Sequence, residues 1–155
     1  MPVPTREESL AWLASRKVED ADIWLDEQGG APLAAYEQCQ LGNREALDDF
    51  LQLLTQPSPE GALAMAEQLQ KTPLAMPVSW LQRWLYDLSS CKLSGSIRYY
   101  PRYRMQLTAM AAKVPATALI TGMATVSQRR AIADHPLSPK LFIEDMLLDY
   151  VKIFS

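Results

Sequence analysis

The sequence predicts an all-α fold, because three observations agree. Apolar residues recur three and four positions apart along most of the chain, which is the period of one helix face. Serine, proline and glycine residues stand between these segments, at the places where helices typically begin and end. The one β-like stretch, residues 96–100, is too short and isolated to make a sheet. We therefore expect about eight or nine short helices with connections of a few residues.

The composition of the 155 residues is typical of one folded domain, or of one domain with a small second piece. Hydrophobic residues make up 48% of the chain and the net charge is −3. A dedicated nucleic-acid domain would carry a surplus of Lys and Arg, so this class is disfavoured. No apolar run approaches the ~18 residues of a membrane helix. The N-terminal stretch does not resemble a signal peptide, and two distant cysteines fit a reducing cytosol. We expect a cytoplasmic protein without membrane contact.

The N-terminal segment predicts three short helices. Thr5 has the spacing of a capping box with Glu8, ahead of the first helix. A second helix is expected over residues 19–28, ending at Gly29. A third begins next, with Pro32 in its first turn, where a missing N–H costs nothing. A seam near residues 41–42 separates this alanine-rich region from the remainder of the chain.

Longer amphipathic helices occupy the chain beyond the seam. Four of them present an apolar stripe, which lies within residues 47–54, 62–69, 81–88 and 107–114. In the third, Gln82, Arg83 and Asp87 lie away from the stripe. Pro115 opens another helix, and Ser138 with its following proline begins the last one.

The last helix carries apolar side chains on two faces. One half of its helical wheel is apolar from Phe142 to Phe154, and the other half is charged. Leu141 and Leu148, seven residues apart, fall in the middle of the charged half. This second stripe predicts a second packing partner, which is either another helix of the same domain or another subunit.

Few residues could carry catalysis. His135, the single histidine, precedes a proline in a turn and has no nucleophile motif beside it. Cys39 and Cys91 fall on small or apolar helix faces, which favours buried, inert thiols. Consecutive carboxylates diverge by ~100° on a helix and so do not share a site. We expect no catalytic residue, no metal site and no cofactor. A hydrolase built on His135 or on a carboxylate pair is the weakest alternative.

One basic and aromatic cluster lies within residues 98–104. Its members are Arg98, Tyr99, Tyr100, Arg102, Tyr103 and Arg104. Such a cluster can stack on bases and contact phosphate, or it can meet another protein. It can also pack as a loop, with the rings over helix ends and the arginines in water. The acidic chain and the lack of a second basic segment favour the packed loop.

Three stretches resemble the C-terminal region of the delta-prime subunits of the bacterial DNA polymerase III clamp loader: TREESLAWLASRKVEDADIWLDEQGGAPLAAY, RWLYDLSSCKLSGSIRYYP and HPLSPKLFIEDMLLDYVKIF. The resemblance covers essentially the whole chain. It implies that residues 1–41 are a small helical lid of the AAA+ type and that residues 42–155 are a collar domain. In that family an ATPase fold precedes these two parts.

The resemblance implies a scaffold that is not itself an enzyme. Its collar would bind other clamp-loader subunits, gamma/tau and delta, and would meet primed DNA and the sliding clamp only through the whole complex. The candidate partner surface comprises Leu141, Leu148, Arg98, Tyr99, Tyr100 and Arg102. Direct nucleic-acid binding by the loop at residues 98–104 is the alternative function.

The joint at residues 29–32 has a further meaning under this resemblance. In ATP-binding relatives this lid helix opens with a Gly-Ser-x-Arg-like pattern, whose arginine reaches the nucleotide phosphates. Here Pro32 stands where that arginine would be. No Lys or Arg occurs between Lys17 and Arg44, so no shifted alignment supplies the charge. We predict a lid that has lost its nucleotide sensor.

Overall fold

The computed structural model describes residues 5–41, 44–131 and 138–154. Within these ranges the regular structure is helical and no strand occurs, so the all-α prediction is confirmed. The β-like residues 96–100 lie in a loop. The elements are α1 (Arg6–Ser15), α2 (Ala21–Glu27), α3 (Pro32–Leu41), α4 (Arg44–Thr55), α5 (Pro59–Leu69), α6 (Ala75–Ser94), the short 3-10 helix η1 (Pro101–Tyr103), α7 (Arg104–Lys113), α8 (Ala116–Ala131) and α9 (Pro139–Ile153).

Local caps begin three of these helices, including the two that the sequence analysis places at Thr5 and Ser138. The side-chain oxygens of Thr5, Ser58 and Ser138 each accept a hydrogen bond from the backbone N–H three residues further on, at 3.2, 3.0 and 3.3 Å. Prolines follow the two serines at the first position of α5 and α9. Each cap contributes about 1 kcal/mol, because it satisfies a donor that the helix itself leaves unpaired.

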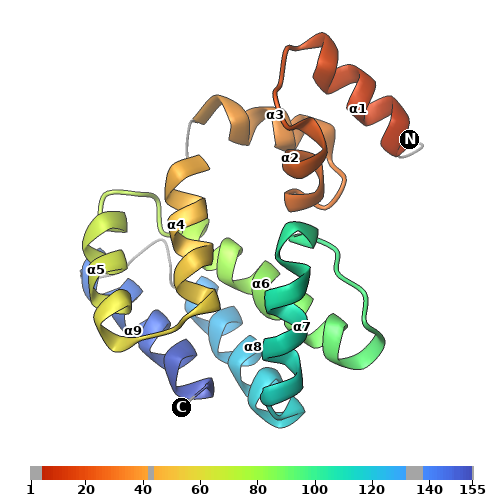
Figure 1. Ribbon diagram of the computed structural model, residues 1–155. Coiled ribbons are helices and arrows are strands. Elements are labelled where there is room, and N and C mark those ends of the chain that lie inside the picture. The colour runs from red at the N-terminus through yellow and green to blue at the C-terminus, as the bar shows by residue number, and fades with distance from the viewer. Residues whose placement is uncertain (1–4, 42–43, 132–137, 155) are drawn as a thin grey trace.

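The helices form two groups, which Figure 1 shows one above the other. Helices α1, α2 and α3 pack on one another, and their buried apolar residues are Leu13, Val18, Trp24, Leu25 and Ala35. Helices α4 to α9 share a much larger cluster. In that cluster α6 packs against α7 and α8, while α5 packs against α9. Each group therefore has a hydrophobic core of its own.

A buried hydrogen-bond chain ties three helices of the larger group. Trp84 Nε1 of α6 donates to the Tyr150 hydroxyl of α9 at 2.9 Å. That hydroxyl donates to the carbonyl oxygen of Leu54, in α4, at 2.7 Å. Burial raises the pKa of the Tyr150 phenol, so it stays protonated and keeps its donor.

No single helix of the described ranges has the length and apolar composition that crossing a membrane requires. One pair, Pro101–Lys113 with Ala116–Arg130, meets that requirement only when joined across a 113° bend.

Candidate functional site

A buried carboxylate holds the loop after α6. Asp87 lies in α6 and is fully buried. It accepts hydrogen bonds from the backbone N–H groups of Arg98, Tyr99 and Tyr100 at 2.8–3.2 Å. Burial raises the pKa of Asp87, and these three N–H groups oppose the rise. Asp87 lies away from the apolar stripe of α6 and is buried all the same, because the loop folds back over this face of the helix.

The loop places two of its three tyrosines in the core. Tyr100 is 1% exposed, and its hydroxyl donates to the carbonyl oxygen of Trp80 at 3.3 Å. Tyr103 is also buried, with its ring edge-on to Trp84 at 5.8 Å. The prediction that Tyr100 belongs to a partner surface is wrong, because the ring has almost no contact with solvent. Both rings behave as the packed-loop interpretation expects.

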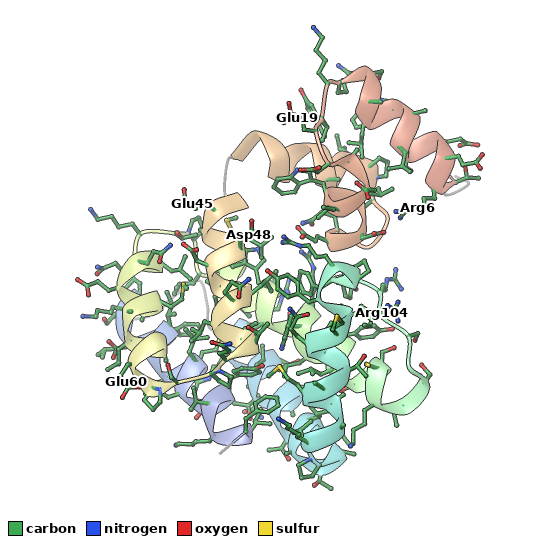
Figure 2. The ribbon with its side chains drawn as sticks, viewed as in Figure 1. Arg6, Glu19, Glu45, Asp48, Glu60 and Arg104 are labelled. Atoms are coloured by element: carbon green, nitrogen blue, oxygen red, sulfur yellow. The ribbon has the colours of Figure 1, made fainter. Side chains whose placement is uncertain are left out.

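Arg102 joins the two groups of helices. Its Nη2 atom lies 2.9 Å from Oε1 of Glu27 in α2 and 2.6 Å from Oδ1 of Asp48 in α4. The Glu27 side chain is 2% exposed, so this ion pair is shielded from water on the carboxylate side. Figure 2 labels Asp48 on α4 and Arg104 at the start of α7, directly after the 3-10 helix that carries Arg102. Arg102 is therefore committed to contacts within the chain.

The same loop touches the joint between α2 and α3. Arg98 Nη2 lies 3.4 Å from the carbonyl oxygen of Gly29, within reach of a weak hydrogen bond. A Cβ at Gly29 would approach Cε1 of Tyr99 to 3.3 Å. Gly29 also has a φ of 67°, in the left-handed region. The close approach and the backbone angle both favour glycine there.

Pro32 begins α3, at the position that the sequence predicts for it. Gly30, two residues earlier, has a φ of 87° and ends the turn. The joint thus has the backbone of a helix–turn–helix connection. The absence of a nucleotide sensor at Pro32 stays a prediction.

Apolar side chains lie partly exposed on the surface of α8 and α9. Leu141 is 58% exposed, and Leu148 is half-buried against the large core. A groove of about 470 Å³ lies between α6, α8 and α9. Its apolar lining includes Leu85, Ala118, Val126, Tyr150 and Ile153. Gly122 allows α9 to approach closely here, because a Cβ on it would come within 2.8 Å of Cδ1 of Ile153.

A second hollow of about 380 Å³ lies beside this groove and is lined by Leu148, Pro59 and Val151. The ion pair between Arg129 and Asp149 stands where the two hollows meet, because both residues line each of them. The sequence signal for this surface is the placement of Leu141 and Leu148 in the charged half of the last helix.

The candidates for chemistry are not brought together. Among the residues described, no group of three or more His, Cys, Asp or Glu could hold a metal ion. Cys91 is half-buried, with Sγ 3.6 Å from Oγ1 of Thr108. His135 and the side chain of Cys39 lie outside the described residues.

Sequence reasoning missed the roles of Glu27 and Asp48, because no local signal shows that a distant arginine reaches both.

Comparison with known proteins identifies the class of this helical chain. Residues 38–152 match the family model described as DNA polymerase III, delta subunit, C terminal. The chain therefore belongs to this family of clamp-loader subunits, which act in DNA replication. No curated protein and no solved structure matches the chain significantly.

Proposed function

We propose that this chain is the lid and collar of a delta-prime-type clamp-loader subunit, and that it acts as a scaffold. The observation that carries this proposal is the apolar surface of α8 and α9. It combines the groove beside Tyr150 with the hollow beside Leu148, and both helices lie within the region that matches the family model. Burying this surface against another subunit would stabilise a ring by the hydrophobic effect.

The division at residues 1–41 and 42–155 is part of the proposal. Two separate hydrophobic clusters support it, because the smaller one ends in α3 and the larger one begins in α4. The contacts of Arg102 and Arg98 with the joint would hold the lid at one angle on the collar. A fixed angle suits a subunit that positions its neighbours.

The scaffold would not hydrolyse ATP. Proline carries no charge with which to meet a phosphate, and Pro32 opens the helix where the relatives carry the sensing arginine. We expect no nucleotide-dependent activity from α3, and we expect the intact subunit to act in the cytoplasm. An ATPase activity that is lost on mutation around Pro32 would contradict this part of the proposal.

The partners would be the collars of gamma/tau and delta subunits. Primed DNA and the sliding clamp would be met only through the assembled complex. Leu141 and Leu148 are the residues that we expect to contact a partner directly. Arg98, Tyr99 and Arg102 contact the lid or the loop within this chain, so the alternative of nucleic-acid binding by residues 98–104 has less surface to use.

Size-exclusion chromatography with the cognate collars tests the proposal. The chain should co-elute with its partners at tens of micromolar, and Leu141→Asp with Leu148→Asp should abolish this. Leu93→Asp is the matched control, because Leu93 is 82% exposed and lies at the end of α6. If the chain fails to co-elute when all partner collars are present, or if the control loses binding equally, the proposed interface is wrong.

A further inference from the structure

A polar groove lies between α6 and α8, apart from the apolar surface of α8 and α9. Its volume is about 300 Å³. Helix α6 contributes residues at positions i, i+3, i+4 and i+7, and α8 contributes residues at i, i+4 and i+7, so each helix presents one continuous face. The lining residues are Ser79, Gln82, Arg83 and Tyr86 of α6, Met123, Ser127 and Arg130 of α8, and Tyr99 of the loop.

Two guanidinium groups share this groove. Arg130 Nη1 donates to Oε1 of Gln82 at 2.6 Å and to Oγ of Ser79 at 3.0 Å. Arg83 lies over the ring of Tyr99, 5.7 Å from its centre. No carboxylate within the described ranges forms a salt bridge with either arginine, whereas Arg6 and Arg129 each pair with one carboxylate and Arg102 with two. Since a guanidinium has five N–H donors, both arginines keep donors for a ligand.

An exposed aromatic ring stands beside these cations. Tyr86 is 42% exposed and contacts Tyr99 edge to face, with 5.5 Å between the ring centres. The edge contact fixes the ring of Tyr86 while leaving part of it open to solvent. Cations next to an open ring are the combination on which single strands of nucleic acid bind, because phosphate meets the charge and a base stacks on the ring.

The remaining groups of the groove also suit a phosphate backbone. Ser79, Ser127 and Gln82 supply hydroxyl and amide donors of the kind that contact phosphate and sugar. No Asp or Glu belongs to the lining residues. Asp87 of the same helix is buried, and its oxygens are occupied by the three backbone N–H groups of the loop. An approaching phosphate therefore meets donors and no exposed carboxylate of the groove.

We propose that the groove between α6 and α8 binds the sugar–phosphate backbone of a single nucleic-acid strand. Arg83 and Arg130 each contact one phosphate, and Tyr86 stacks on one base. Two phosphate contacts make a weak local site, which is compatible with a chain of net charge −3. The groove takes both cations from α6 and α8 and shares only Tyr99 with the loop at residues 98–104. The proposal concerns a single strand and not primed DNA, and it does not depend on the scaffold function.

Fluorescence anisotropy of a labelled ten-nucleotide oligothymidylate with the 155-residue chain tests this site. Two phosphate contacts to a single strand predict a slope of about −1.4 for log K against log salt, or about sevenfold weaker binding at 200 mM than at 50 mM salt. Arg83→Gln with Arg130→Gln should remove the salt dependence. Tyr86→Leu should weaken binding about fivefold or more and leave the slope unchanged.

Arg104→Gln is the matched control, because Arg104 is an exposed arginine outside the groove. It should bind as the unchanged chain does, and circular dichroism should show every variant folded. The proposal is overturned by an absence of binding at 50 mM salt, or by an equal loss in the control. It is also overturned if polyglutamate or inorganic phosphate displaces the strand as well as unlabelled oligothymidylate does, since the groove would then be a general anion site. None of these outcomes bears on co-elution with other subunits.

Discussion

Helices α1 to α3 and helices α4 to α9 are stabilised in different ways. The smaller group buries a short set of apolar residues around Leu13 and Leu25. The larger group buries a continuous core around α6, and it includes the buried chain from Trp84 through Tyr150 to Leu54. A core as small as the first contributes little net stability once the entropy of ordering the chain is subtracted.

The smaller group is therefore expected to depend on polar contacts with the larger one. Arg102 holds Glu27, and Arg98 with Tyr99 covers the joint at Gly29. That loop is itself held by Asp87. The difference teaches that a few well-placed polar groups can fix the position of a unit whose apolar burial is small.

Two tryptophans give the largest effect and test the comparison directly. Trp84 is fully buried in the large core, while Trp12 is half-buried beside Tyr36 in the small group. Trp84→Ala should lower the free energy of unfolding by about 3–5 kcal/mol, because it leaves a cavity and removes the hydrogen bond that the Tyr150 hydroxyl accepts. Trp12→Ala should cost clearly less in urea denaturation. Equal losses would contradict the view that the large core dominates stability.

Arg102→Gln should cause the next largest loss of stability. It leaves the carboxylate of Glu27 buried without its guanidinium, at a cost of about 1–3 kcal/mol. Hydrogen exchange should accelerate in α2 and α3 and stay unchanged in α8 and α9. Arg104 has no carboxylate partner among the described residues. Arg104→Gln should therefore leave hydrogen exchange unchanged in both regions. A uniform acceleration along the chain would show that Arg102 does not act as a link between the two groups.

Gly29 and Gly30 form a matched pair with a smaller effect. Both have positive φ, so an alanine at either costs about 1–2 kcal/mol of backbone strain. Only at Gly29 does the added Cβ meet another residue, the ring of Tyr99, whereas nothing lies within 4 Å at Gly30. Thermal unfolding should therefore show Gly29→Ala to be the more destabilising. Equal midpoints would indicate that the loop does not press on the joint.

The raised pKa of Asp87 predicts that the stability of the fold depends on pH. This is the smallest of the expected effects, because the backbone hydrogen bonds to the carboxylate oppose the effect of burial on its pKa. Its pKa is raised in the folded state, so the folded chain keeps a proton that the unfolded chain has released. Its contribution to stability is highest below the unfolded pKa of about 3.9 and falls as pH rises through the folded pKa. The stability of the unchanged chain relative to Asp87→Asn should decrease over that window in urea titrations. Asp145→Asn, the same substitution at an exposed position, is the control for the change of side chain.

The helices were predictable from the sequence because their signals are local. The caps at Ser58 and Ser138 act within three residues, and the apolar stripe from Leu81 to Leu88 repeats within one helix. The role of Asp87 was not predictable, because its three donors come from a loop 11–13 residues further along the chain. The burial of Tyr100 could not be predicted for the same reason.

One candidate surface could likewise be predicted from the sequence, and the other could not. The leucines of α9 were found from their helical spacing, while the groove between α6 and α8 needed the packing of two helices that brings Gln82 and Arg130 together from 48 residues apart. By itself the sequence determined the all-α class, the capped starts of α1 and α9 and the absence of Lys and Arg around Pro32, since these depend on neighbouring residues. The tertiary structure decided which polar groups are buried, which arginines are paired and where grooves remain, because burial and pairing depend on residues that only folding brings together.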